Sequence, residues 1–249
     1  MSPIELATPV GQLVAERPAR ARVFERFGID YCCGGQTPLR DACAAGGIDP
    51  RAVAAALGAA DADATATNDA DWTTAPLADL IANIVDTHHA YLRRELPRLT
   101  QLVAKVYQVH GTRHTELTDV QEVFGDLQAE LEAHMMKEER ILFPMIETIA
   151  SSGAHSAAHC GSVQNPIRVM EHEHDSAGAA LARLRELTAG YAPPVDACNT
   201  YRALLSGLAE FEADLHTHIH KENNILFPRA VELEATRCGS TTTARPVYE

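Results

Sequence analysis

The sequence lacks the long apolar runs, the basic leader and the basic clusters that mark several classes of protein. No uncharged apolar stretch approaches the roughly 20 residues that a membrane-spanning helix needs, and the N-terminus MSPIELATPV has no basic segment followed by an apolar one. We therefore expect a cytoplasmic protein with no membrane partner. Lys and Arg number 21 against 34 Asp and Glu and are scattered, so a phosphate backbone would be repelled and no nucleic acid partner is expected.

Cysteine is also too sparse for a disulfide-stabilised fold, since six residues are spread over 249. Any special role of a cysteine is therefore chemical, and four of the six are expected to be simple packing or surface residues: Cys43, Cys160, Cys198 and Cys238. Histidine, by contrast, is abundant. All twelve histidines lie between residues 88 and 220, many of them among carboxylates, and this enrichment indicates metal binding.

Composition divides the chain into four regions. Residues 1–58 hold short helical patterns around the CCGGQTP turn signal at 32–38, which predicts a small separate helical domain. Residues 59–75 are rich in Ala, Asp and Thr and poor in large apolar residues, which predicts a linker. Residues 76–235 contain four long helical patterns, and residues 236–249 are polar, Thr-rich and expected to be disordered.

The four long patterns predict an all-α fold, an antiparallel four-helix bundle preceded by the small helical domain. Pro76 suits the first turn of the first helix, because its missing amide hydrogen costs little there. One face of the second helix and one face of the fourth are expected to be buried. They carry Leu127, Leu131, Ile141, Leu142, Met145 and Ile149 in the second helix, and Leu204, Leu208, Phe211, Leu215, Ile225 and Leu226 in the fourth.

An internal repeat locates the candidate site. The segment HMMKEERILFP in the second helix returns 84 residues later as HIHKENNILFP in the fourth, with the His, the Glu and the ILFP at identical spacing. At an offset of 85 residues, the first and third helices match as well, each with one His among apolar neighbours. The repeat therefore pairs His134 with His218, Glu138 with Glu222 and His89 with His174.

The repeated residue types favour a buried metal centre. A helix turns about 100° per residue, so a His and a Glu four residues apart stand on one face, which is the apolar face in both helices. Buried carboxylates need a cation or a metal, and no Lys or Arg lies near them on either stripe. Four imidazoles and two carboxylates suit iron or manganese better than structural zinc. The alternative is a set of ordinary core histidines, which the duplication of all six residues disfavours.

Two neighbouring choices arise around these ligands. Glu130 and Asp214 stand one turn before His134 and His218, and they are either acceptors that orient the imidazoles or solvated helix residues. His216 and His220 should face away from the metal.

On the first helix, only one of the neighbours His88 and His89 can point at the metal. The upstream apolar stripe favours His88. The repeat favours His89, and we choose His89 because ligand geometry must be reproduced in both halves.

These motifs carry a family resemblance. The bundle with its two His-x-x-x-Glu motifs resembles the hemerythrin-like proteins, and DYCCGG at 30–35 is similar to the short leading domain of the RIC (repair of iron centres) family. The resemblance implies two iron ions in an oxo- and carboxylate-bridged non-haem centre, held by His89, His134, Glu138, His174, His218 and Glu222. Each iron would take two histidines and share both glutamates, which leaves positions for a small molecule or for iron release.

The same resemblance implies a function. It predicts a protein that repairs iron-sulfur clusters damaged by nitric oxide or oxidative stress, by iron donation, nitric oxide removal or both. Its partners would be damaged iron-sulfur cluster proteins, with nitric oxide or oxygen as a small-molecule ligand. The alternative is a hemerythrin-like sensor or carrier of oxygen or nitric oxide, whose leading domain only signals or dimerises. Oligomeric state is left open, with a homodimer through the leading domain as one option.

The adjacent thiols of Cys32 and Cys33 are the candidate catalytic groups of the leading domain. A disulfide between neighbours is strained, so a reduced pair, or one thiol joined to a third cysteine, is expected. Gly34 and Gly35 allow the backbone to expose both thiols, which favours a transient iron, nitrosyl or disulfide-exchange site. The alternative is two small apolar residues in a turn. Paired exposed thiols favour repair, since a carrier has no need of them.

Overall fold

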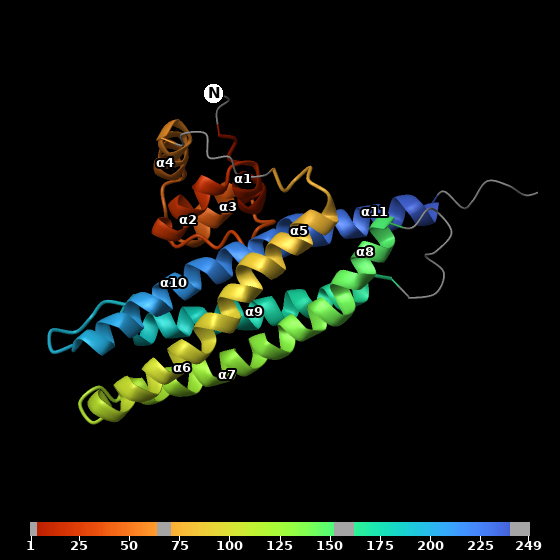
Figure 1. The fold of residues 1–249 in the computed structure, drawn as a ribbon. Helices are drawn as coiled ribbons and strands as arrows, with labels where there is room; N and C mark the ends of the chain where they lie inside the picture. Colours follow the sequence, from red (N-terminus) through yellow and green to blue (C-terminus); the bar gives the residue numbers. More distant parts are fainter. Residues whose placement is uncertain (1–3, 64–70, 152–161, 240–249) are drawn as a thin grey trace, which may run out of the picture. The chain divides into compact units, whose positions relative to one another are not determined.

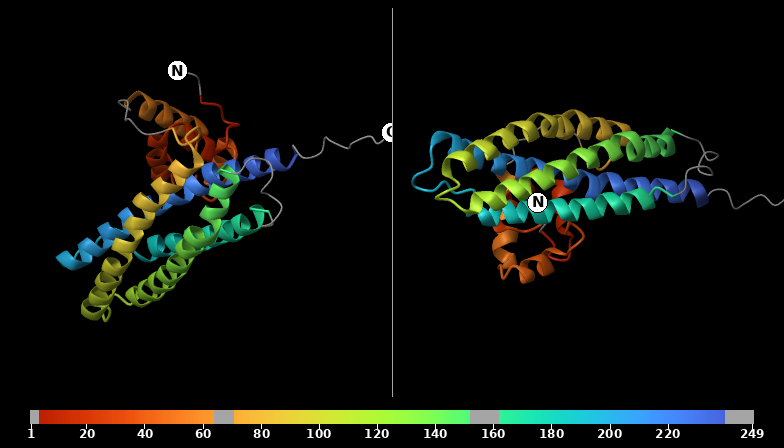
Figure 2. Two further views of the ribbon diagram at one scale, coloured as in Figure 1. Left: turned by 45° about the vertical axis from the view of Figure 1, so that its right-hand side comes forward. Right: turned by 90° about the horizontal axis from the view of Figure 1, so that it is seen from below.

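The computed structural model describes residues 4–63, 71–151 and 162–239. These residues form helices and no β-strand, with one isolated bridge between Pro9 and Pro38, so the all-α prediction is confirmed. The chain forms two compact units (Figures 1 and 2). The leading unit comprises Met1–Ile81, Met145–Ile167 and Ile219–Glu249, and the bundle unit comprises Ala82–Pro144 and Arg168–His218.

Four helices lie side by side in the bundle unit, as predicted (Figures 1 and 2). They are α6 (Ala90–His110), α7 (Glu116–Lys137), α9 (Gln164–Leu187) and α10 (Asn199–Lys221). Apolar side chains at helical spacing fill the space between them, among them Leu96, Leu99 and Leu181, each at most 1 % exposed. The rings of Phe124 and Phe211 meet edge to face with centroids 5.9 Å apart. This core holds the helices that carry the candidate ligands.

Three helices contain a π-helical segment, which the sequence analysis did not predict. The segments are η2 (Ile84–His89), η3 (Glu138–Leu142) and η4 (Glu222–Leu226), and they connect to α5 (Leu77–Asn83), α8 (Phe143–Ser151) and α11 (Phe227–Gly239). A π-helical turn holds an extra residue and is frequent at functional sites. Here η2 ends at a candidate ligand, and η3 and η4 each begin at one.

Burial differs between the two π-helical segments that begin at a glutamate. Ile141, predicted on the buried face, is 54 % exposed, whereas its repeat counterpart Ile225 is 4 % exposed. Both follow the glutamate by three residues, within the π-helical segment. In the leading unit, η4 packs against α1 (Val10–Glu16). The prediction for Ile141 is therefore wrong and that for Ile225 is confirmed, so the difference lies in what packs against each turn and not in the π-helical geometry that both share.

The leading unit begins with a small helical module. It comprises α1, a short 3₁₀ helix η1 (Pro18–Arg20), α2 (Ala21–Phe27), α3 (Leu39–Ala45) and α4 (Pro50–Asp63). Helix α4 continues beyond residue 58, where the predicted domain ended. Both side chains of the ion pair Arg20–Asp61 are buried, and two hydrogen bonds of 3.0 and 2.7 Å hold the guanidinium to the carboxylate. The predicted linker thus starts as helix, and its residues 64–70 lie outside the described part.

Asn224 of η4 contacts the module within the leading unit. Its Nδ2 donates to the carbonyl oxygens of Tyr31 and Cys32, at 3.3 and 2.9 Å. The side chain sits against two glycines: a Cβ at Gly11 would lie 2.4 Å from Asn224 Oδ1, and a Cβ at Gly35 would lie 2.0 Å from the same atom. Neither position has room for a side chain while Asn224 keeps this conformation.

Replacing Gly35 with Ala is therefore expected to lower the stability of the protein by about 1–3 kcal/mol, the usual cost of overpacking. Thermal unfolding measures the effect. The control is Gly58→Ala in α4, where nothing lies within 4 Å of the new Cβ. That change should be neutral or stabilising, since Ala favours helix over Gly. A Gly35→Ala protein that melts with wild type would show that Asn224 does not require this space.

Other contacts fix the ends of this unit. Arg229 donates Nη1 to the carbonyl of Trp72 at 2.7 Å and Nη2 to the carbonyl of Ala75 at 2.6 Å, and Lys221 Nζ lies 5.6 Å from the centroid of the Trp72 ring. Within the leading unit, the end of the predicted linker is thereby attached to α11 and to Lys221. At the C-terminus, α11 extends to Gly239, past the predicted start of the tail at 236, and residues 240–249 lie outside the described part.

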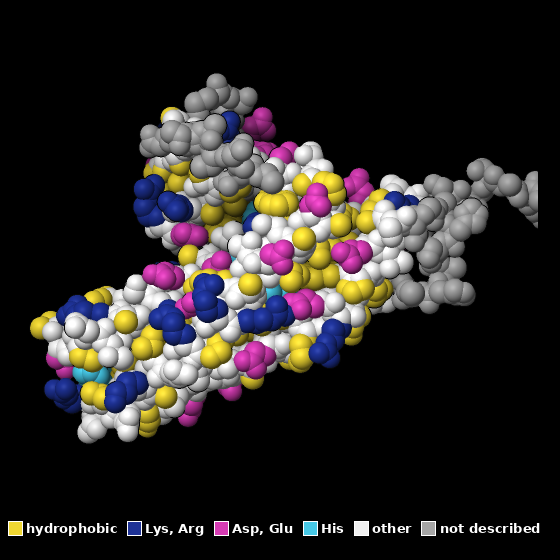
Figure 3. Space-filling view, in the orientation of Figure 1, with side chains coloured by type: hydrophobic (Ala, Val, Ile, Leu, Met, Phe, Trp, Pro, Cys, Tyr) yellow, Lys and Arg dark blue, Asp and Glu magenta, His cyan; other side chains and the backbone are white. Residues whose placement is uncertain are grey.

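On the face of the molecule drawn in Figure 3, Lys and Arg side chains are interspersed with Asp and Glu. Among the helices that the structure describes, none combines the length and the hydrophobicity needed to cross a membrane.

Candidate metal centre

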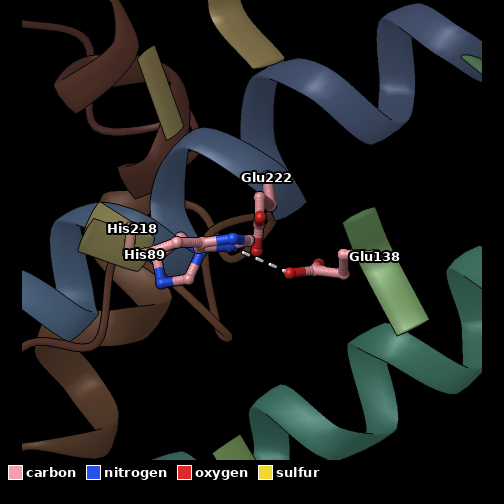
Figure 4. A group of neighbouring side chains, drawn as sticks. All are labelled: His89, Glu138, His218 and Glu222. Carbon is pink, nitrogen blue, oxygen red and sulfur yellow. Dashed lines mark hydrogen bonds and ion pairs between the residues drawn. The ribbon is translucent and has the colours of Figure 1, made fainter. Parts of the chain in front are cut away.

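The bundle unit brings four histidines together as two pairs. His89 Nε2 lies 3.2 Å from His218 Nε2, and His174 Nε2 lies 3.0 Å from His134 Nε2. Glu138 reaches both pairs: its Oε2 is 3.2 Å from His89 Nε2 and its Oε1 is 3.4 Å from His134 Nε2. Figure 4 shows the Glu138 carboxylate and the His89 imidazole pointing toward one another. Each oxygen of one carboxylate thus faces one histidine pair.

The five side chains are buried, with exposures between 0 and 2 %. One ligand atom each from His89, Glu138 and His218 lie within 4.8 Å of one another, and the same holds for His134, Glu138 and His174. A carboxylate this deep is costly unless a positive charge accompanies it. Nitrogen and oxygen donors that converge in this way fit a metal ion in each group.

Two further carboxylates fix the orientation of the imidazoles. His89 Nδ1 lies 2.6 Å from Glu139 Oε1, and His134 Nδ1 lies 2.9 Å from Glu173 Oε2. When Nδ1–H donates to a carboxylate, the neutral imidazole presents the lone pair of Nε2 on its other side. The lone pairs therefore point at the Glu138 carboxylate and at the partner histidines, as metal ligation requires.

Both orienting carboxylates are stabilised as anions. Burial raises the pKa of Glu139, but hydrogen bonds from His89 and Arg93 outweigh it and leave the pKa lowered. The pKa of Glu173 is lowered in the same way, with burial opposed by hydrogen bonds from Lys137 and His134. An ionised carboxylate can only accept, so each keeps a proton on Nδ1 of its histidine.

Glu130 and Asp214, the predicted candidates for this orienting role, lie elsewhere. Glu130 accepts a hydrogen bond from Ser176 Oγ at 3.1 Å, and Asp214 Oδ1 lies 3.0 Å from His88 Nδ1. The orienting interpretation of these two residues is therefore wrong. The sequence did contain a signal for the two carboxylates that orient the imidazoles. Glu139 directly follows the candidate ligand Glu138, and Glu173 directly precedes the candidate ligand His174.

His88 is buried beside the centre but belongs to neither ligand group. Its ring stacks on His218 with centroids 5.5 Å apart and an interplanar angle of 1°. It thus packs against the neighbouring helix, while His89 presents Nε2 to Glu138. On the fourth helix, His220 points to the leading module, with Nδ1 3.4 Å from the carbonyl oxygen of Tyr31, and burial lowers the pKa of this imidazole to about 4. The sequence analysis had given it no partner.

Glu222 begins η4, one helical turn beyond His218 on the same continuous helix. Its side chain is fully buried. Figure 4 draws it with His218, His89 and Glu138. The repeat makes it the counterpart of Glu138, which likewise follows its histidine by four residues and opens a π-helical segment.

The thiol motif is built around Asp30. Its carboxylate accepts from the backbone N–H of Cys32, Cys33 and Gly34 at 2.9, 3.0 and 2.8 Å, which closes the turn that the DYCCGG sequence predicts. The two thiols are not joined to each other, since their Sγ atoms lie 3.7 Å apart. Cys32 is buried and Cys33 is partly exposed. Ligand atoms of Asp30, Cys32 and Cys33 lie within 4.8 Å of one another.

Comparison with known proteins places the chain in a family. Residues 80–230 match the model of the hemerythrin HHE cation binding domain, and residues 6–61 match a domain of unknown function (DUF542). The iron-sulfur cluster repair proteins YtfE of Musicola paradisiaca and Edwardsiella ictaluri are 42 % and 40 % identical to this chain. The matches cover 91 % and 90 % of this chain and 97 % and 96 % of those proteins. The chain belongs to the RIC family.

Membership of the RIC family agrees with the two-part organisation of the chain. The protein of the same name from Pectobacterium carotovorum is 42 % identical over 90 % of this chain and 97 % of its own length, so the similarity runs through both matched domains. The hemerythrin HHE match contains all six candidate ligands, and the DUF542 match contains both thiols. The buried His and Glu groups of this RIC family member fit a cation binding domain.

Proposed function

We propose that this protein holds two iron ions in its bundle and repairs iron-sulfur clusters damaged by nitric oxide or oxidative stress, through iron donation, nitric oxide removal or both. The observation that carries the proposal is the position of Glu138, with one oxygen toward each of two buried histidine pairs. The names of its relatives, iron-sulfur cluster repair proteins, support the physiological role.

The geometry suggests how the ligands divide. His89 and His218 would hold one iron, His134 and His174 the other, and Glu138 would bridge them. Glu222 is proposed as the second bridge because the repeat matches it to Glu138. Mixed nitrogen and oxygen ligands suit iron or manganese, and the relatives' names favour iron. The iron pair would supply positions for a small molecule, or iron for release to a client.

The surrounding residues prepare this site. Glu139 and Glu173 hold the protons at Nδ1 and so keep the Nε2 lone pairs turned inward. The ring of Phe143 stacks on His89 with centroids 5.8 Å apart. Phe143 is itself buried, and it excludes water from that side of the imidazole. A fixed ring orientation and a dry surround raise the affinity of such ligands for metal.

The thiols are proposed to act together with the bundle, and Cys33 is proposed as the thiol that meets the client. The pKa of Cys32 is raised well above its usual value by its hydrogen bond with Cys33, by burial and by Asp30. Cys32 is therefore a poor nucleophile as long as the hydrogen bond between the two thiols persists. The carbonyl of Cys32 is bound by Asn223 and Asn224, the two residues after Glu222. The thiol motif is therefore attached to the helical turn that carries a candidate ligand.

The test is recovery of a nitrosylated iron-sulfur client by the purified, iron-loaded protein, compared with the same protein stripped of iron. Recovery should need the iron. Changing Cys32 and Cys33 together to Ser should lower the recovery rate, because these thiols are proposed to take part in transfer. The double variant should keep its iron, since neither thiol is a bundle ligand, and its iron content is therefore the control for folding.

Two outcomes would contradict this proposal. Equal recovery with iron-free protein would remove the role of the metal and favour the sensor or carrier. Unchanged recovery in the double variant, with iron retained, would return the two cysteines to the role of small residues in a turn.

A further inference from the structure

We propose a second metal site, for zinc, at the end of the bundle unit where the connections 111–115 and 188–198 meet. Its ligands are His110, at the end of α6, His114 in the first connection, and Asp196 and Cys198 in the second. The site would tie the two connections together and so join the first pair of bundle helices to the second pair.

Two pairs of these side chains already lie at ligand distances. His110 Nε2 is 3.2 Å from Cys198 Sγ, and His114 Nε2 is 3.0 Å from Asp196 Oδ1. One ligand atom each from His110, His114 and Asp196 lie within 4.8 Å of one another. With zinc bonds of about 2.0–2.3 Å, the edges of a tetrahedron are roughly 3.3–3.6 Å long, so the two close pairs fit nearly as they stand and the pairs must draw closer to each other on binding.

The donor set selects the metal. Two imidazoles, one carboxylate and one thiolate are the ligands that tetrahedral zinc takes in proteins. This set differs from the centre described above, which contains no thiol. The two places are also far apart, because His110 follows His89 by 21 residues along α6, roughly 30 Å at the rise of an α-helix. A metal here cannot belong to the other centre.

Neighbouring groups orient the ligands for this role. Glu116 Oε1 lies 3.1 Å from His114 Nδ1, which turns Nε2 of that imidazole toward Asp196. Arg113 is 3.7 Å from Oδ2 of Asp196, so the other oxygen, Oδ1, is the one that faces His114. The Tyr201 ring packs against both imidazoles, with centroids 5.4 and 5.7 Å away. The rings are therefore held in place without a metal.

Cys198 is placed to act as a thiolate. It directly precedes α10 and accepts hydrogen bonds at the N-terminus of this 23-residue helix, where the helix dipole favours an anion. Its Sγ lies 3.2 Å from His110 Nε2 and beside the backbone N–H groups of Tyr201 and Thr200. Cys198 is exposed, as the sequence analysis expected of a surface residue, but its contact with His110 was not predicted. Of the other three, Cys43 is buried, and Cys160 and the side chain of Cys238 lie outside the described residues.

His110 does not behave as an ordinary core histidine. It is 4 % exposed, and its Nδ1 has no hydrogen-bond partner among the described residues. Among the described residues, the hydrogen bond of its side chain is to a thiol, a weak partner that would not by itself justify burying an imidazole. Metal ligation through Nε2 explains why this ring is directed at Cys198.

The experiment uses the iron-loaded full chain and Co²⁺ as a spectroscopic substitute for zinc. Co²⁺ should bind at about one per chain and give the near-ultraviolet thiolate charge-transfer band and the visible bands of a tetrahedral site. Zinc should displace it, and the bound iron should be unchanged. Cys198→Ser should abolish the charge-transfer band, and His114→Gln should weaken binding at least tenfold. Glu116→Gln should weaken binding about tenfold, as loss of an orienting acceptor does.

Matched variants separate this site from others. His172→Gln replaces an exposed histidine of α9 and should bind Co²⁺ as wild type does. Cys33→Ser removes a thiol of the Asp30 group and should keep the band. The proposal is overturned if the band survives Cys198→Ser, if it vanishes in Cys33→Ser, or if Co²⁺ enters only as iron leaves. Circular dichroism of each variant shows that a lost band is not lost fold.

Discussion

Glu138→Gln is expected to reduce the iron content from about two ions per chain to nearly none, because one carboxylate serves both histidine pairs. The amide keeps the shape of the side chain but removes the negative charge and one oxygen donor. Both pairs then lose one of the two shared anionic ligands that we propose. Iron analysis, together with the near-ultraviolet absorption of oxo-bridged iron, measures the loss. Glu222→Gln should have the same effect through the second bridge.

The matched control is Glu130→Gln, an identical change on the exposed side of the same helix α7. Its partner is Ser176, and iron content should be that of wild type. If Glu138→Gln kept both ions, the bridging assignment would fail. A wild-type protein with one tightly held zinc in the bundle, and no iron, would sink the whole di-iron proposal.

The second large effect is expected from His89→Ala, which should lose iron or strongly perturb its absorption. His89 Nε2 faces both Glu138 and His218, while Nδ1 is held by Glu139, so no other atom can take its place. Its neighbour gives a matched comparison. His88→Ala removes a ring that stacks on His218 and pairs with Asp214, and it should keep about two irons because it removes no ligand.

The comparison of these two variants is decided by metal content rather than by spectrum alone, since loss of the stacked ring can shift absorption without releasing iron. Retained iron in His89→Ala with loss in His88→Ala would mean that the first helix binds metal one residue earlier than argued. Thermal unfolding of both proteins without iron would show whether either change acts through the fold.

The sequence predicted the elements whose signal repeats along the chain. Four long helices follow from apolar periodicity, and the all-α bundle with its leading helical domain is confirmed. The family resemblance is confirmed by matches over both domains. The repeat also selected residues that the bundle unit places together: Glu138 between His89 and His134 is a convergence of two helices that periodicity alone does not give. Their role as iron ligands stays a prediction.

The sequence failed where a contact depends on a partner far away in the chain. Periodicity placed both Ile141 and Ile225 in the core, but only Ile225 is buried, because burial depends on which element packs against the turn, and α1 packs against η4. Orientation of His134 by Glu173 depends on which helix lies opposite, 39 residues on. The extension of α4 depends on the buried pair of Arg20 with Asp61, across 41 residues.

The two copies of the repeat have diverged where the leading module attaches. After the shared glutamate the first copy has Glu139, which serves a histidine of the bundle, and the second has Asn223 and Asn224, which bind the backbone beside the thiols. The first copy of the repeat therefore lacks the two asparagines that bind the leading domain in the second copy. If recombination brought in a foreign leading domain with a side chain at position 11 or 35, that side chain would clash with Asn224. The backbone beside the thiols would then lose its hydrogen bonds to η4. The two domains are consequently expected to be inherited as one unit.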